Sequence, residues 1–106
     1  MGNRKRVAGT GMPRLIYSRN ALYDLQRLHR FLSAKNPAAA KRARESILKS
    51  VQTLRLQPNI GRPVEDMPDE YREWVVDFGD SGYIIYYRVS ESEATILAVR
   101  HQKEAP

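Results

Sequence analysis

The chain has 106 residues, no cysteine and a formal net charge of +6. This length allows one domain with a single core, and the lack of cysteine excludes disulfide scaffolds, zinc–thiolate sites and thiol chemistry. No apolar run approaches the roughly 18–20 residues that span a membrane, and the N-terminus lacks the apolar segment of a secretory signal. We therefore expect a cytoplasmic protein without a membrane segment.

The positive charge is unevenly distributed along the chain. Residues 1–11 hold three Lys or Arg and no acid, residues 12–62 hold eleven against two acids, and residues 63–106 hold four against ten. This asymmetry favours an acidic partner or a nucleic acid, although single cations also serve simply as solvated helix faces. Because glycines surround its basic triplet, segment 1–11 is expected to be a disordered leader, with Met12 a candidate natural start. Residues 12–106 are expected to form one domain.

Two helices are predicted after a short strand at Leu15–Tyr17. Ser18 is a candidate N-cap for a helix over Arg19–Ala34, because its hydroxyl can accept an otherwise unpaired backbone N–H. The apolar stripe of this helix is Leu22, Leu25, Leu28 and Leu32, flanked by Ala21 and Phe31. Asn36-Pro37 then begins a second helix that extends to about Leu56. Its apolar face is Ala40, Ala43, Ile47, Val51 and Leu54, which predicts an antiparallel helical hairpin.

The last third of the chain predicts three consecutive strands. A loop with Pro58, Gly61, Pro63 and Pro68 is expected to contain no regular structure. Strands follow at about Tyr71–Phe78, Tyr83–Val89 and Ala94–Arg100 and form an antiparallel meander. The predicted fold is α+β, in the order β-α-α-β-β-β, with a helical hairpin on one face of a small antiparallel-rich sheet. The first strand is expected at an edge or in parallel pairing with a later strand.

Alternation along the strands predicts which side chains share a face. In the middle strand, Tyr83, Ile85, Tyr87 and Val89 oppose Ile84, Tyr86 and Arg88. In the last strand, Ile96, Ala98 and Arg100 oppose Leu97, Val99 and His101. If the helices cover one face, Arg88 lies on the open face near Tyr86. His101 lies just past the strand and is free to turn to either side.

Arg62, Arg88 and His101 are the candidate chemical residues. Two guanidinium groups can hold a phosphate, and a histidine can transfer a proton near neutral pH. Lys103 adds charge nearby, which completes the set that an RNA-cleaving site needs. The structural alternatives are that Arg88 pairs with an acid such as Asp77 and that His101 is a strand-end histidine. The acidic residues between 65 and 70 lack metal-ligand spacing, so neither a metal nor a cofactor is expected.

Several motifs together resemble the RelE/ParE superfamily, the toxins of type II toxin–antitoxin pairs. They are A-L-Y-D-L at Ala21–Leu25, N-P-A-A-A-K-R-A at Asn36–Ala43, L-x-x-x-P-x-x-G-R-P ending at Pro63, and F-G-D-S-G-Y-I-I-Y-Y-R…A-V-R-H-Q-K-E-A near the C-terminus. The resemblance covers nearly the whole chain from Met12. Among its members, RelE-like proteins are ribosome-dependent mRNA endonucleases, and Arg62, Arg88 and His101 match their phosphate-binding and acid/base positions. ParE-like members inhibit DNA gyrase instead and are not nucleases.

The resemblance implies three functions. The residues of the C-terminal motif are similar to those of ParE-type plasmid-stabilisation proteins, which favours a toxin that acts on DNA gyrase. The alternatives are an mRNA endonuclease that acts with the ribosome, since the residues match, and an inactive homologue that only binds its antitoxin. In the nuclease pattern a tyrosine follows the histidine, but here Gln102 follows His101. Enzymatic activity thus depends on the branch, since a gyrase inhibitor is not an enzyme and an mRNA endonuclease is one.

A toxin of this superfamily implies a cognate antitoxin, an extended acidic or amphipathic chain that folds as it wraps the toxin. The basic helical half offers complementary charge, and the groove of the hairpin offers apolar anchors. The residues expected to contact the antitoxin are Arg27, Arg30, Lys41, Arg44 and Tyr86.

Overall fold

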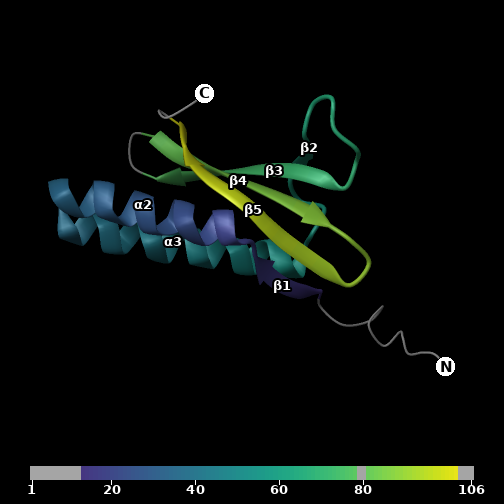
Figure 1. Ribbon diagram of the computed structural model, residues 1–106, viewed down its shortest axis with the longest axis horizontal. Helices are drawn as coiled ribbons and strands as arrows, with labels where there is room; N and C mark the ends of the chain where they lie inside the picture. The colour runs from purple at the N-terminus through teal and green to yellow at the C-terminus, as the bar shows by residue number, and fades with distance from the viewer. Residues whose placement is uncertain (1–12, 79–80, 103–106) are drawn as a thin grey trace.

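The computed structural model describes residues 13–78 and 81–102. The basic leader expected over residues 1–11 and the cation Lys103 lie outside these residues. Within the described part of the chain, neither helix is long and apolar enough to cross a membrane. The chain there forms a strand, two helices and four further strands, arranged as a helical layer against a sheet (Figure 1).

The two helices begin at the predicted caps. α2 spans Arg19–Lys35 and α3 spans Pro37–Leu56. The Ser18 hydroxyl accepts a hydrogen bond from the N–H of Ala21, and the Asn36 side chain accepts from two N–H groups in the first turn of α3. Both N-caps are therefore confirmed, because each satisfies backbone donors that the helix itself leaves unpaired.

Five strands in the described part form one sheet, in the order β1-β5-β4-β3-β2. They are β1 (Arg14–Tyr17), β2 (Arg62–Pro63), β3 (Tyr71–Phe78), β4 (Ser81–Val89) and β5 (Glu93–His101). β1 lies at an edge and pairs in parallel with β5, while the other pairs are antiparallel. The α+β fold with a helical hairpin on one face is thus confirmed (Figure 1).

One strand lies where only a loop was expected. β2 consists of two residues at the other edge of the sheet, where Arg62 pairs with Glu73 and Pro63 pairs with Arg72. Proline has no N–H to donate, but an edge strand has a side that needs no donor. The expectation of no regular structure across this proline-rich segment is therefore wrong at these two residues.

The core lies between the hairpin and the sheet. On the sheet side, the alternation in β4 is confirmed, because Tyr83, Ile85 and Tyr87 are almost completely buried. All five apolar residues predicted for α3 are also buried: Ala40, Ala43, Ile47, Val51 and Leu54. The stripe on α2 is only partly correct, since Leu28 is 3% exposed but Leu22 is 51% exposed. One side of α2 thus remains open.

β5 departs from strict alternation at Leu97. Its pairing with β4 shifts between Tyr86 and Tyr87, so that Leu97 is an extra residue in a β-bulge. Ile96 and Val99, three residues apart, are consequently both buried in the core. The expectation that these two residues lie on opposite faces is wrong, because a bulge resets the alternation of every residue that follows it.

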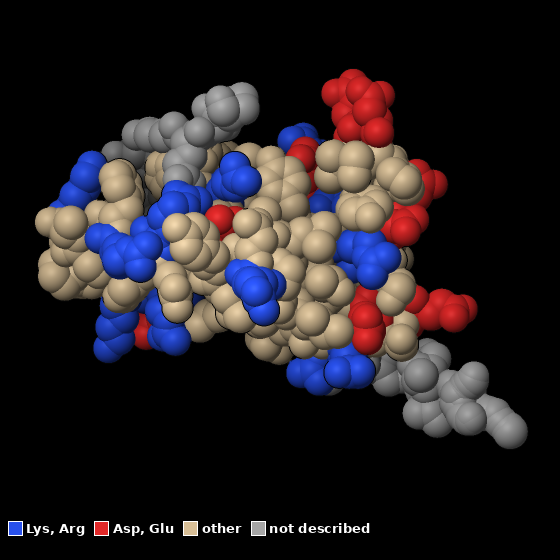
Figure 2. All heavy atoms as spheres, in the orientation of Figure 1, with Lys and Arg blue, Asp and Glu red and all other residues tan. Residues whose placement is uncertain are grey.

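The charge asymmetry of the sequence becomes a separation in space. Figure 2 shows Lys and Arg over much of the molecule, densely over the helices, whereas Asp and Glu gather at the opposite end. Most of these acids belong to the loop between β2 and β3 and to the turn between β4 and β5. An acidic partner is therefore attracted first to the helical half of the molecule.

Candidate functional site

Arg88 lies on the face of the sheet that the helices leave open, as the alternation predicted. It pairs with Tyr71 of β3 and with Thr95 of β5. Asp77, considered as its ionic partner, lies at the other end of β3 and pairs with Gly82. The ion pairs found among residues 13–78 and 81–102 do not include Arg88. Its side chain is half-buried among the strands.

Arg62 lies on the same open face, at the edge of the sheet. Its side chain is 71% exposed, and its Nε is 2.6 Å from Oε2 of Glu73 on the neighbouring strand. Arg62 and Arg88 are two inter-strand spacings and two residues apart, which corresponds to roughly 12 Å between their Cα atoms. A phosphate that binds between the two guanidinium groups has to compete with Glu73 for Arg62.

His101 is the last residue of β5 and lies on the other face. It pairs with Tyr83, whose side chain is buried in the core. The two rings meet edge to face, with 5.2 Å between their centroids and 82° between their planes. The strand therefore extends one residue further than predicted, and its pairing fixes the side on which His101 lies.

The three candidate residues are not brought together. Arg62 and Arg88 share the open face, whereas the imidazole of His101 lies on the helix-covered face, against Tyr83. A general acid or base works within hydrogen-bond reach of the proton that it transfers, directly or through one water. In this conformation the sheet separates the imidazole from a phosphate held by the two arginines.

A hydrogen-bonded loop precedes Arg62. The Tyr87 hydroxyl donates to the carbonyl of Pro58 at 2.7 Å and accepts from the N–H of Gly61 at 2.9 Å, and Arg72 donates to the Gly61 carbonyl at 2.8 Å. Burial raises the pKa of the Tyr87 phenol, although the Gly61 N–H and the Arg72 charge act in the opposite direction. These contacts fix the position from which Arg62 extends.

Glycine is required within this loop by the closeness of its neighbours. A Cβ at Gly61 would lie 2.6 Å from the Tyr87 hydroxyl and 2.7 Å from the backbone carbonyl of Glu73. Both distances are shorter than real Cβ contacts, so any larger residue would displace the loop. The G-R-P motif thus combines a close backbone approach with an exposed arginine.

Asp24 is a residue that the sequence reading missed. Its carboxylate is buried, with the residue only 4% exposed, and Oδ2 accepts from the N–H of Val99 at 3.0 Å. Two cations lie near it: Arg27 at 3.6 Å and Arg100 at 3.8 Å. An acid within the apolar stripe of a helix was the available signal, because a buried charge requires partners from another element.

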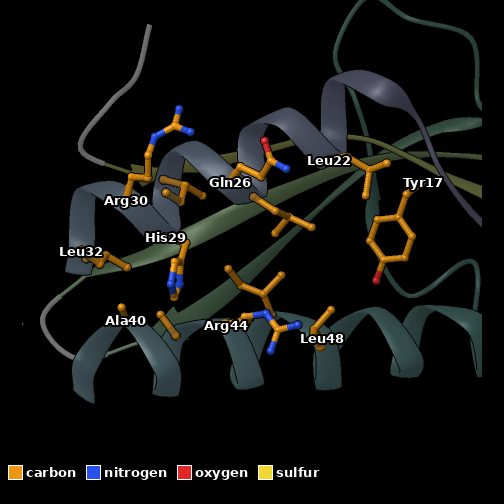
Figure 3. Close-up of a pocket in the computed structure, with 13 residues that line it drawn as sticks. Tyr17, Leu22, Gln26, His29, Arg30, Leu32, Ala40, Arg44 and Leu48 are labelled. Atoms are coloured by element: carbon orange, nitrogen blue, oxygen red, sulfur yellow. The ribbon is translucent and has the colours of Figure 1, made fainter. Parts of the chain in front are cut away.

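An apolar groove of about 580 Å³ lies between the two helices. Its apolar lining is Tyr17, Leu22, Leu25, Leu28 and Leu32 on one side and Ala40, Ala43, Ile47 and Leu48 on the other. The polar residues that line it are Gln26, His29, Arg30 and Arg44. In Figure 3, the side chains of His29 and Arg44 lie between the helices, whereas the Arg30 guanidinium turns away from α3.

The residues expected to contact an antitoxin do not form one surface. Arg30 and Arg44 line the groove. Arg27 is half-buried and pairs with Asp24, and Lys41 is exposed on α3 outside the groove lining. Tyr86 lies on the open face of the sheet, with Arg88 two residues further along β4. The groove is thus the surface on which two of the five expected residues converge.

No metal-binding cluster is found in the described part of the chain. Among residues 13–78 and 81–102, no group of three or more His, Asp or Glu side chains is arranged to hold an ion. The acidic residues between β2 and β3 lie mainly on the exposed loop.

Comparison with known proteins shows the family to which this chain belongs. A family described as the ParE toxin of the type II toxin–antitoxin system parDE matches residues 15–106. The chain belongs to this family. A curated relative, Toxin RelE3 of Caulobacter vibrioides, is 36% identical over 81 residues, which are 76% of this chain and 85% of the relative. Membership of the RelE/ParE superfamily of type II toxins is thereby confirmed.

Solved structures share the fold of this ParE-family chain at low sequence identity. The chromosomal ParDE system of P. aeruginosa matches with a TM-score of 0.68 at 22% identity, over 85% of this chain and 96% of that one. RelE from E. coli, as a substituted variant in the free state, matches with a TM-score of 0.63 at 17% identity, over 90% and 88%. The RelBE2 complex of Mycobacterium tuberculosis matches with a TM-score of 0.62 at 19% identity, over 87% and 100%.

Proposed function

We propose that this toxin arrests growth in the cytoplasm by binding DNA gyrase, without metal, cofactor or RNA cleavage. The observation that carries the proposal is the position of His101 on the helix-covered face, against Tyr83 and away from the two arginines. Acid/base catalysis on RNA needs the imidazole and the phosphate clamp at one place. The match to the ParE family supports a protein target instead.

The test is a plasmid-cleavage assay with purified toxin, DNA gyrase and ATP. The expected product is linear DNA trapped with gyrase, formed equally well by the wild type and by the Arg88→Ala/His101→Ala double variant. A matched control without toxin gives the background. If gyrase is unaffected at toxin concentrations that stop growth, the gyrase proposal fails.

A RelE-type endonuclease is the second candidate, and two observations favour it. Arg62 and Arg88 do share one face, and a relative at 36% identity is named RelE3. For this candidate, mRNA bound to ribosomes is cleaved by the wild type, and the double variant loses at least about a hundredfold in cleavage rate. Cleavage that survives both substitutions contradicts a role for these residues.

We also propose that a cognate antitoxin neutralises the toxin by covering the groove between α2 and α3. Leu22 is half-exposed there, and an amphipathic helix can bury it together with the neighbouring leucines. Arg44 lies between the helices and Arg30 at the margin, so an acidic residue on the partner finds opposite charge in the groove. The solved relatives include a ParDE system and a RelBE complex, which supports an antitoxin partner.

The antitoxin proposal is tested by co-expression and growth. Arg44→Glu places an acid in the groove, whereas Lys49→Glu makes the same charge change on α3 outside the groove lining. Growth inhibition by Arg44→Glu is expected to persist when the antitoxin is co-expressed at a level that suppresses the Lys49→Glu variant. Equal neutralisation of both variants argues for another antitoxin surface.

A further inference from the structure

The outer edge of β5 is only half covered by a neighbouring strand. β1 pairs in parallel with Glu93–Ile96. From Leu97 to His101, no strand in the described part of the chain lies on this side. An uncovered edge offers free backbone groups to strands of other molecules. The end of β5 is therefore where intermolecular pairing is to be expected unless something else occupies those groups.

Ser18, the N-cap of α2, and side chains from the first two turns of α2 occupy them. The bulge turns the carbonyls of two consecutive residues, Ile96 and Leu97, toward Ser18: the first accepts from the Ser18 N–H at 2.9 Å and the second from its hydroxyl at 3.1 Å. The Leu97 carbonyl also accepts from Nδ2 of Asn20 at 3.0 Å. Both carbonyls are thus satisfied without a partner strand.

Asp24, one turn further along α2, binds the next backbone group on the outer edge of β5. Its Oδ2 accepts from the N–H of Val99, which is the next edge group beyond the bulge. Asn20 donates toward the same oxygen at 3.5 Å, and the guanidinium groups of Arg27 and Arg100 lie within 4 Å of the carboxylate. A buried carboxylate with these partners keeps its charge compensated, so it can occupy an edge position that a strand would otherwise fill.

We propose that Ser18, Asn20 and Asp24 close the outer edge of β5 against pairing with a strand of a second copy of this chain, with Asp24 as the residue that holds the closure. The three residues lie about 75 to 79 positions from their partners in the sequence and replace the hydrogen bonds that a sixth strand would make. This closure is independent of the toxin's target and of the groove.

The first test uses the full chain as it exists. Amide hydrogen exchange, followed by NMR in dilute protein, is expected to show the Val99 N–H at least tenfold more protected than that of an exposed residue such as Ser92. Exchange of Val99 as fast as that of Ser92 would overturn the proposal without any variant being made.

The second test compares three variants. Asp24→Ala removes the acceptor, Asp24→Asn keeps one oxygen for the Val99 N–H, and Glu45→Ala changes an exposed acid on α3 as a control. At matched concentrations in sedimentation velocity, Asp24→Ala is expected to self-associate at least tenfold more tightly than the wild type, with faster Val99 exchange in dilute solution. Asp24→Asn and Glu45→Ala are expected to associate no more tightly than the wild type. A folded Asp24→Ala variant that associates no more tightly than the wild type would overturn the closure.

Discussion

The two sides of α2 differ in how completely the chain itself provides their partners. On the side toward β5, every polar group named above has a partner: Ser18 caps the helix and binds the bulge, and Asp24 accepts from Val99. On the side toward α3, leucines line a groove and Leu22 remains half-exposed. A side whose polar groups are hydrogen-bonded within the chain stabilises the fold, whereas an apolar side that remains exposed is suited to binding a partner.

The largest expected effect comes from comparing two leucines of α2 that differ in burial. Leu28→Ala removes a side chain that is 3% exposed, and we expect the free energy of unfolding to fall by about 3 kcal/mol, from lost burial and the cavity left behind. Leu22→Ala, at 51% exposure, is expected to change it by less than about 1 kcal/mol. Urea unfolding of both variants measures the difference.

Equal losses of unfolding free energy at the two positions would contradict the difference in burial between Leu28 and Leu22. The Leu22→Ala variant is expected to lose antitoxin affinity in spite of its small effect on stability, because the side chain it removes is available to the groove's occupant. Isothermal titration with the cognate antitoxin measures that loss directly.

The next prediction concerns the side of α2 toward β5 and removes a charge while keeping a hydrogen-bond acceptor. Asp24→Asn keeps an oxygen for the Val99 N–H but removes the negative charge between Arg27 and Arg100. We expect the free energy of unfolding to fall by about 2 kcal/mol, less than full removal of a buried partner would cause. Thermal unfolding measures it, and a change no larger than that of Glu45→Gln would show that the carboxylate charge contributes little.

Local sequence signals predicted the elements that depend on neighbours in the chain. The helices follow from Ser18, Asn36 and their apolar periods, and the open-face position of Arg88 follows from alternation along one strand. The bulge at Leu97 could not be predicted in this way. The groups that stabilise it lie at the start of α2, nearly eighty residues earlier, so only the tertiary structure joins cause and effect.

The candidate site shows the same limit. Alternation along β4 was enough to place Arg88 on the open face, but the face on which His101 lies depends on its pairing with Tyr83. That pairing is set by the bulge, which shifts every later residue of β5. A residue that follows an undetected bulge cannot be assigned to a face by counting from the strand's start.

A third prediction concerns the loop that carries Arg62. Tyr87→Phe leaves the Pro58 carbonyl and the Gly61 N–H without their partner, so we expect a loss of about 1.5 kcal/mol in the free energy of unfolding at neutral pH. Burial raises the pKa of the Tyr87 phenol in the folded state above its usual value of about 10.

The pH dependence follows from that direction. The folded state holds the phenolic proton more tightly than the unfolded state, so this contribution is complete below pH about 10 and is lost as the pH rises through the folded pKa. The difference in stability between wild type and Tyr87→Phe is therefore expected to shrink above pH about 10. Burial also raises the pKa of Tyr17, but both proteins share that effect. Denaturant unfolding from pH 8 to pH 11 measures the difference, and one that stays constant across this range would contradict the assignment.

The smallest expected effect tests the open side of α2 and its partner. Arg44→Glu reverses a charge that lies in the groove, and Lys49→Glu reverses one on the same helix outside the groove lining. For an acidic antitoxin, we expect Arg44→Glu to weaken binding about tenfold, or about 1.4 kcal/mol, and Lys49→Glu to weaken it by less than about threefold.

Because both substitutions change the net charge equally, long-range attraction falls by a similar amount in each, and the remaining difference in affinity comes from the groove. Titration at two salt concentrations separates these contributions, since screening reduces the long-range part and leaves a contact inside the groove largely intact. If the two variants lose affinity equally at both salt concentrations, the antitoxin is attracted by the overall charge of the helical half and does not occupy the groove.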